Sequence, residues 1–256
     1  MNDYKLIKVE QSEGRTDIIL NSPPLNILTI AMMGEISDAA NQAAADGALR
    51  ALVFRSEGKH FSAGADVAEH TNEMVNEMII AFGDMFKVIS EVPAVTIAAV
   101  DGSALGGGCE LATFCDIVVA SDRAKLGQPE IQLGVFPPVA VIIFPRLIGR
   151  NRAMELLLSG AVIGAEEAER IGLINHIFPA DEFIEKVDEF VANFTKLSAS
   201  SLALTKKMID RGLYVPVREG LRMADETYLN ELMITDDANE GLASFLEKRK
   251  PLWKNR

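Results

Sequence analysis

The stretch "AVTIAAVDGSALGGGCELATFCDIVVAS" (residues 94–121) combines two apolar runs with a glycine-rich loop. The runs at 94–100 and 116–121 are typical of strands that are buried on both faces of a sheet. The three glycines at 106–108 cannot serve helix propensity, because each costs about 1 kcal/mol relative to alanine inside a helix. We interpret them as part of a loop that opens a short helix running toward Cys115. The stretch therefore predicts a strand–helix–strand unit.

The preceding sequence shows the same alternation of strands and helices. Two short segments, 5–10 and 16–20, are expected to form a hairpin. The segment 48–56 reads as another buried strand, and helices are expected at 29–45 and 72–90. Strands that alternate with helices favour right-handed crossovers and a mainly parallel sheet, so the predicted fold class is α/β.

The character of the chain changes beyond about residue 181. Further segments have helical spacing, so we place a boundary near Lys196, with a core at 1–196 and a helical region at 197–256. The helices are expected at 182–196, 200–211, 216–233 and 236–249. Their apolar side chains either pack against another subunit or fold back on the core, and composition alone leaves both open.

The composition restricts the classes of partner. A net charge of −12 over 256 residues argues against nucleic acid or an anionic membrane surface as the partner. The N-terminus does not resemble a signal peptide, and the longest apolar stretch, 134–145, is too short to span a bilayer. We therefore expect a cytoplasmic protein without membrane contact. The basic tail at 247–256 is either a solvated helix end or the binding place of a small polyanion.

Cysteine and histidine usage gives no sign of a metal or redox centre. Cys109 and Cys115 have no partner pair, and we expect two free buried thiols. His60, His70 and His176 form no pair with the spacing of metal ligands. We expect no bound metal and no cofactor.

The glycine loop at 102–108 does not fit the nucleotide-binding motifs. It matches neither GxGxxG nor GxxxxGK[ST], and the GxSxG motif of serine hydrolases is absent from the sequence. Its position before a helix exposes the N–H groups of the first helical turn, and glycines let a substrate carbonyl approach them closely. This describes half of an oxyanion hole. A tight crossover that needs glycines only for packing is the alternative.

Two glutamates stand in apolar or small-residue surroundings. Glu110 lies on the helix after the glycine loop, where burial raises a carboxyl pKa toward the working range of a general acid or base. Glu130 stands in "KLGQPEIQLGV" (125–135), again after a strand. One structural salt bridge for each is the alternative. Two carboxylates in such settings favour a paired acid–base role on one small molecule.

A second candidate donor loop lies in "HFSAGADVAEH" (60–70), after the strand at 48–56. Its small residues at 62–65 permit a close backbone approach at the end of a parallel strand. Ligands of open α/β sheets bind at this edge. The sequence thus predicts a second set of backbone donors there.

Taken together, these segments resemble the enoyl-CoA hydratase/isomerase (crotonase) family. "HFSAGAD", the stretch at 98–121, "KLGQPEIQLGV" and "GLINHIFP" (172–179) look like family motifs in their usual order. The resemblance covers essentially the whole chain. It implies a spiral of ββα units with a C-terminal helical region for trimerisation, usually as a dimer of trimers.

The resemblance also implies roles for particular residues. The two peptide N–H groups of the family's oxyanion hole match Ala65 and Gly107, and its two catalytic glutamates match Glu110 and Glu130. Asp66 matches an aspartate near the pantetheine and adenine region of an acyl-CoA substrate. The expected substrate-binding residues are completed by Ala63, Val67, Gly106, Pro129, Val139, Phe144 and, in the basic tail that resembles the segment near the CoA phosphates, Lys248.

One stretch departs from ordinary enoyl-CoA hydratases, which carry a glycine-rich segment after the second glutamate. Here it reads "PPVAVIIFPRL" (137–147), which predicts a more apolar acyl pocket. Val139, Val141, Ile142, Ile143 and Phe144 supply its walls, or alternatively they are helix core packing. In this segment the sequence resembles cyclohexa-1,5-diene-1-carbonyl-CoA hydratases. The same resemblance is found in four further segments: "GQPEIQLGVFPP" (127–138), "LSASSLAL" (197–204), "YLNELM" (228–233) and 236–256.

The expected activity is therefore the addition of water to an unsaturated acyl-CoA, with the cyclic diene as the substrate. A straight-chain enoyl-CoA hydratase, an isomerase and a thioesterase are alternatives of the same fold. A scaffold or RNA-binding relative is disfavoured, because this chain keeps both glutamates and is acidic. A glycosidase is a less favoured alternative, because one Trp and three Tyr offer few aromatic surfaces on which sugars could stack.

Overall fold

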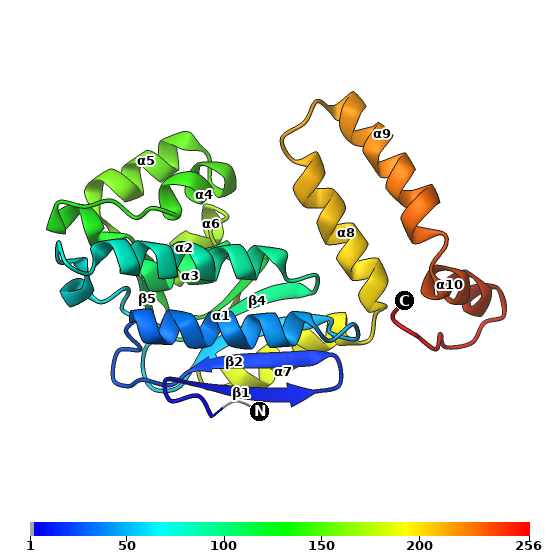
Figure 1. Cartoon of the computed structure of the whole chain (residues 1–256), viewed down its shortest axis with the longest axis horizontal. Helices are drawn as coiled ribbons and strands as arrows, with labels where there is room; N and C mark the ends of the chain where they lie inside the picture. Colours follow the sequence, from blue (N-terminus) through cyan, green and yellow to red (C-terminus); the bar gives the residue numbers. More distant parts are fainter. Residues whose placement is uncertain (1–2) are drawn as a thin grey trace.

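The computed structural model describes residues 3–256 and is built around a six-stranded sheet (Figure 1). Its strand order is β1-β2-β3-β4-β6-β9. β1 and β2 form the predicted antiparallel hairpin, and every other pair in this sheet is parallel. The strands are β1 (Ile7–Ser12), β2 (Arg15–Leu20), β3 (Ala51–Ser56), β4 (Val95–Val100), β6 (Ile117–Ser121) and β9 (His176–Phe178). The predicted mainly parallel α/β sheet is confirmed.

Helices cover both faces of this sheet. Alternation along β3 directs Leu52 and Phe54 into the large core and Ala51 and Val53 into a smaller one. Helices α1 (Ile30–Ala44) and α2 (Val75–Glu91) pack on the first face, and α7 (Phe183–Thr195) packs on the second (Figure 1). The apolar runs of the strands are therefore explained by burial on both sides, as predicted.

A second, three-stranded sheet was not predicted from the sequence. It pairs β5 (Ser103–Leu105) in parallel with β7 (Lys125–Gly127), and β7 runs antiparallel to β8 (Val162–Gly164). Three residues give too short a hydrophobic pattern to be recognised as a strand. The remaining helices of the core are α3 (Gly107–Phe114), α4 (Ala140–Leu147), α5 (Arg150–Ser159) and α6 (Ala165–Arg170).

The C-terminal arm (residues 199–256) stands to one side of the sheet and its covering helices (Figure 1). It contains α8 (Ala199–Gly212), α9 (Val217–Thr227) and α10 (Asp236–Leu246). The helix expected at 216–233 is divided: α9 ends at Thr227, and Tyr228–Leu232 forms a π-helical turn. At the base of the arm, Lys206 on α8 lies 2.7 Å from a carboxylate oxygen of Asp116 and donates to the carbonyl of Ala94.

The arm presents an extensive apolar surface. A groove of about 530 Å³ runs between α8 and α9, and Ile209, Leu221 and Tyr228 in its lining are more than half exposed. On α10, Phe245 is 82% exposed. The sequence left open whether these side chains pack on the core of the same chain or on another subunit. Because they are exposed in the single chain, its own core does not cover them.

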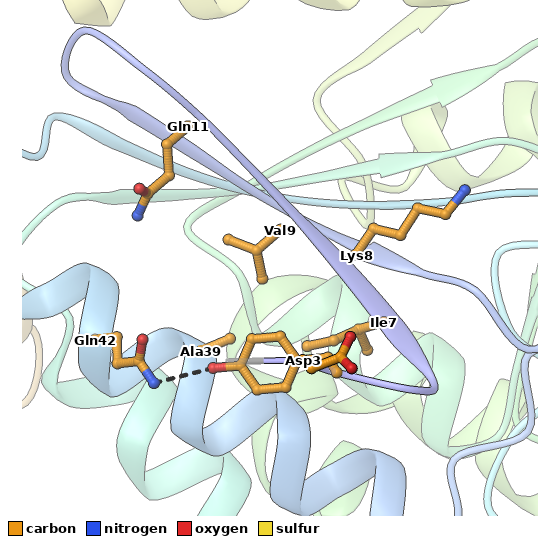
Figure 2. A pocket seen from close by; sticks show the side chains of 8 residues that line it. Asp3, Ile7, Lys8, Val9, Gln11, Ala39 and Gln42 are labelled. Carbon is orange, nitrogen blue, oxygen red and sulfur yellow. Dashed lines mark hydrogen bonds between the residues drawn. The ribbon is translucent and has the colours of Figure 1, made fainter. Parts of the chain in front are cut away.

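A smaller hollow of about 240 Å³ lies between β1 and α1 (Figure 2). In it, the amide of Gln42 on α1 donates to the hydroxyl of Tyr4 at 3.1 Å. None of the residues that line it was predicted to contact substrate. Separately, none of the helices described in residues 3–256 has the length and apolar character needed to cross a membrane.

Candidate active site

The two predicted donor loops lie against each other. The N–H of Ser62 donates to the carbonyl of Ser103 at 3.1 Å, and the N–H of Leu105 donates back to the carbonyl of Ser62 at 2.9 Å. A Cβ atom on Gly108 would stand only 2.6 Å from the Ser62 carbonyl oxygen. Glycine at this position is therefore required for the close approach of the two loops.

This approach brings Ala65 and Gly107 together. A Cβ atom on Gly107 would lie 3.2 Å from the amide nitrogen of Ala65, and one on Gly64 would lie 3.5 Å from the amide nitrogen of Gly107. Within residues 3–256, neither of these two N–H groups donates to another protein group. Two neighbouring unpaired donors, one of them at the start of α3, can stabilise a negatively charged oxygen.

Gly106 joins this pair of donors to Glu130. Its backbone has φ +51° and ψ −130°, which residues with a Cβ rarely adopt. A Cβ atom here would stand 2.6 Å from Oε1 of Glu130 and 3.8 Å from the Cα atom of Gly64. The carboxylate of Glu130 therefore lies beside both loops.

Glu110 projects from the first turn of α3 and is 1% exposed. Its Oε1 atom accepts hydrogen bonds from the N–H groups of Val139 at 2.7 Å and Ala140 at 2.8 Å, where α4 begins. Burial is the largest influence and raises the pKa of Glu110 to about 7, while these two hydrogen bonds act in the opposite direction. The carboxyl group can therefore exchange a proton near neutral pH.

Glu130 lies on the short 3₁₀ helix Pro129–Leu133 and is half-buried. Burial raises its pKa, and a nearby His70 acts to lower it. The charge of Glu130 in turn raises the pKa of Glu110, so the two carboxyl groups are close enough to influence each other. Neither forms a salt bridge within the described residues, so the salt bridges that the sequence left open for them are not formed there.

Gln128 is a site residue that the sequence reasoning missed. Its side chain is fully buried. With the amide oriented to satisfy its neighbours, Nε2 lies 3.1 and 3.2 Å from the two carboxylate oxygens of Glu130 and 3.3 Å from the carbonyl of Gly106. The sequence did offer a signal for Gln128. It is a polar residue that directly follows a buried strand and lies two positions before Glu130.

The other predicted residues near the loops have mixed surroundings. Asp66 caps the 3₁₀ helix Val67–His70 by accepting from the N–H of Ala68 at 2.9 Å, and Val67 is 63% exposed. Ala63 donates its N–H to the carbonyl of Leu25, and Pro129 occupies the first position of its helix.

Most of the apolar segment after Glu130 packs in or against the large core, and Ile142 is the exception among the five predicted wall residues. Ile142 is 54% exposed, and Val139, Val141 and Ile143 are half-buried. Phe144 is 1% exposed and packs in the large core. Core packing, the alternative considered from the sequence, therefore describes Phe144, whose ring does not face an open pocket.

The basic tail is not near the glutamates of its own chain. Lys248 follows α10, which lies on the opposite side of Figure 1 from α3. Arg249 pairs with Glu240 and Glu247. Lys254 and Arg256 both pair with Asp236, whereas Lys248 and Lys250 have no ion pair within residues 3–256.

The predicted free thiols are confirmed: Cys109 and Cys115 are buried and unpaired. Burial raises the pKa of each thiol well above its ordinary value, so neither is a ready nucleophile. The groups of this site that could take part in chemistry are therefore two backbone donors and two carboxyl groups. These can polarise a carbonyl and move protons on the carbon atoms conjugated with it.

Comparison with known proteins agrees with this geometry. A protein of Mycobacterium tuberculosis named as a probable enoyl-CoA hydratase is 37% identical over 99% of each chain. The cyclohexa-1,5-dienecarbonyl-CoA hydratase of Thauera aromatica is 36% identical over 93% of this chain and 92% of its own. A crystal structure of an enoyl-CoA hydratase subunit from Geobacillus kaustophilus superimposes with a TM-score of 0.91 at 33% identity, covering 100% of both chains. Residues 10–256 match the enoyl-CoA hydratase/isomerase profile, and the chain belongs to this family.

Proposed function

We propose that this hydro-lyase adds water to cyclohexa-1,5-diene-1-carbonyl-CoA and forms 6-hydroxycyclohex-1-ene-1-carbonyl-CoA. The observation that carries the hydration is the presence of two N–H groups without protein acceptors, on Ala65 and Gly107, beside two interacting carboxyl groups that form no salt bridge within the described residues. An isomerase of this family usually works with one glutamate, so two interacting glutamates favour hydration.

In the proposed reaction, the thioester carbonyl oxygen accepts hydrogen bonds from Ala65 and Gly107. The oxygen atom of water bonds to the carbon β to the thioester, and the π electrons of that double bond move toward the carbonyl. The negative charge that develops on the carbonyl oxygen is stabilised by the two fixed donors. Glu110 and Glu130 hold the water and transfer its proton.

In the cyclic diene, the negative charge also reaches the far end of the second double bond. Protonation at that carbon completes a 1,4-addition and leaves one double bond conjugated with the thioester. The atoms of one water molecule are all retained in the product. Because the addition of water neither oxidises nor reduces the substrate overall, the reaction needs no redox cofactor.

The apolar start of α4 supports the cyclic substrate. The helix that holds Glu110 through Val139 and Ala140 carries Ile142, which is 54% exposed, where ordinary hydratases of the family have glycines and polar residues. A flat ring without polar groups is compatible with such a wall. The likeness to the hydratase of Thauera aromatica is a second support.

A straight-chain enoyl-CoA is the second candidate substrate. The relative from Mycobacterium tuberculosis has the same level of identity and bears a general hydratase name. The same donors and glutamates would act on its single conjugated double bond, with protonation on the carbon α to the thioester.

We also propose that the protein assembles as a trimer or a dimer of trimers through the C-terminal arm. Ile209, Leu221 and Phe245 expose large apolar areas there, which is unusual for a surface that stays in water. Assembly would let Lys248 of one subunit approach the phosphates of a CoA ester bound to another. Light scattering on the purified protein measures the mass, and a 27.8 kDa species would contradict this assembly.

A panel of CoA esters tests the proposed activity. The purified protein is incubated with the cyclic diene, crotonyl-CoA and a saturated acyl-CoA, and the products are identified by mass. We expect the gain of one water by the unsaturated esters and no change in the saturated one. A product of unchanged mass but altered double-bond position would indicate an isomerase, and free CoA thiol a thioesterase.

A further inference from the structure

Asn26 is a fully buried polar residue that has no place in the mechanism above. Its backbone has φ +49°, a left-handed conformation that asparagine tolerates better than most residues with a Cβ atom. Its Oδ1 atom accepts from the N–H of Ser22 at 2.8 Å, and its Nδ2 atom donates to the carbonyls of Glu57 at 3.0 Å and His60 at 2.9 Å. The side chain therefore ties the chain before Asn26 to the segment that leads from β3 into the donor loop at 60–70.

Ser62 connects the backbone of Asn26 to this donor loop. Its hydroxyl donates to the carbonyl of Asn26 at 2.7 Å and accepts from the N–H of Gly64 at 3.2 Å. Ser62 is fully buried, so water does not compete for either hydrogen bond. The hydroxyl thus holds the loop at the residue that precedes the proposed donor Ala65.

The N–H groups on both sides of Ala65 are held in place. Ser62 holds that of Gly64, and the segment 25–28 holds two more. These two hydrogen bonds join the N–H of Ala63 to the carbonyl of Leu25 at 2.9 Å and the N–H of Asp66 to the carbonyl of Leu28 at 3.3 Å. Within the described chain, the N–H of Ala65 is therefore the one in residues 63–66 that has no protein acceptor.

The direction of the Ala65 N–H group follows from a further contact of the same peptide group. The carbonyl of Gly64 belongs to this peptide and accepts from the N–H of Leu28 at 2.9 Å. In a trans peptide the carbonyl and the N–H point to opposite sides, so this bond turns the N–H of Ala65 away from Leu28. The same amide nitrogen lies 3.2 Å from the Cβ position of Gly107, beside the second donor.

We propose that Asn26 and Ser62 are positioning residues that aim the N–H of Ala65 at the thioester carbonyl oxygen. Asn26 fixes its own segment against the start of the donor loop, and Ser62 fixes the loop beside the donor. A donor that is held before the substrate arrives stabilises the developing negative charge without having to reorganise. This inference rests on the proposed hydration.

S62A tests the proposal, because it removes the hydroxyl and keeps the Cβ atom. We expect kcat for the ester that the wild type hydrates to fall about tenfold, while Kd for butanoyl-CoA stays within about twofold. A misdirected donor weakens transition-state stabilisation more than ground-state binding.

N26G is the second variant. It removes three side-chain hydrogen bonds, and glycine keeps the left-handed backbone conformation, so the same split between kcat and Kd is expected. S37A is the matched control, because its hydroxyl donates within α1 to the carbonyl of Met33 at 2.8 Å and touches neither donor loop.

Infrared difference spectroscopy provides a measurement that does not depend on turnover. Spectra of bound butanoyl-CoA with and without ¹³C at the thioester carbonyl isolate the stretching band of that group. Hydrogen bonding to a carbonyl lowers its stretching frequency, so we expect the band in the wild type to lie below its position in water. In S62A and N26G it should move back toward that position, and in S37A it should not move.

A wild-type band position in both S62A and N26G, or an equal loss of kcat and of ester affinity, would overturn the positioning role. A wild-type protein that shifts the carbonyl band but hydrates no unsaturated ester would instead contradict the proposed function alone.

Discussion

The carboxylate of Glu110 accepts a hydrogen bond at 2.7 Å from the backbone N–H of Val139. This contact joins the first turn of α3 to the start of α4, which lies in the apolar segment 137–147. The start of this helix therefore fixes the carboxylate that we propose as an acid–base group. A substitution in this segment therefore has to preserve the position of the Val139 N–H group if Glu110 is to keep its hydrogen bond.

The two glutamates are predicted to be separately essential. E110Q and E130Q remove the ionisable proton and keep the shape of each side chain, so both variants should fold and lose about 10²–10⁴-fold in hydration rate. Initial rates on the confirmed ester give the measurement. E155Q, on the exposed surface of α5, is the matched control. Near-full activity of either site variant would assign that glutamate a structural role.

Burial of Glu110 predicts a pH-dependent stability. Its folded-state pKa of about 7 lies above the ordinary 4.5, so the folded protein binds this proton more tightly than the unfolded chain does. The resulting stability is fully present below the unfolded-state pKa and is lost as the pH rises through about 7. From pH 5.5 to 8.5, the free energy of unfolding of the wild type should fall by about 2 kcal/mol relative to E110Q.

Denaturant titrations at the two pH values, with equal protein concentrations, measure this difference. Equal concentrations are needed because assembly contributes to apparent stability. A stability difference between wild type and E110Q that does not change with pH would show that Glu110 keeps an ordinary pKa.

The contact between the donor loops predicts a specific intolerance at Gly108. In G108A, the new methyl group would meet the Cβ and carbonyl oxygen of Ser62 at 2.6 Å, and backbone atoms cannot move aside cheaply. Separation of the loops should lower kcat more than tenfold, because the two N–H groups would no longer converge. G83A on α2 has nothing within 4 Å of its added methyl and should retain activity. Full activity of G108A would contradict the assigned loop geometry.

Much of this arrangement follows from local sequence pattern. The buried strands and the helices α1, α2 and α3 have long apolar runs or clear periodicity, and burial on two faces enforces them. The three-residue strands β5, β7 and β8 have neither a long apolar run nor a periodic pattern. Their pairing is set by tertiary contacts.

The site shows the same division. The glycine loop and Glu110 were recognisable because glycines and a carboxylate are unexpected in apolar company. The hydrogen-bond partner of Glu110 could not be recognised, because it is the backbone N–H of Val139 and any residue type can supply such a group. Gln128 is adjacent to recognised residues, but its contact with Glu130 depends on how β7 ends. Lys248 illustrates the limit of motif reasoning, since it follows α10, which lies far from α3 in the same chain (Figure 1).

The tail predicts an effect on binding rather than on turnover. Lys248 and Lys250 have no ion pair within the described chain, whereas Arg249 is held by Glu240. K248A/K250A should therefore weaken binding of the CoA ester several-fold and leave kcat nearly unchanged, because the phosphates lie far from the reacting carbons. Calorimetric titration with a saturated CoA ester gives Kd. K186A on α7 is the control, and an unchanged Kd would indicate a solvated tail.

The most direct test of the account is the ratio of kcat/KM for two esters, measured with the same wild-type preparation. We predict a higher kcat/KM for cyclohexa-1,5-diene-1-carbonyl-CoA than for crotonyl-CoA, because the segment 137–147 is apolar and the two donors are proposed to stabilise the extended charge. A kcat/KM for crotonyl-CoA that equals or exceeds that for the cyclic diene would contradict the assignment and indicate a general enoyl-CoA hydratase.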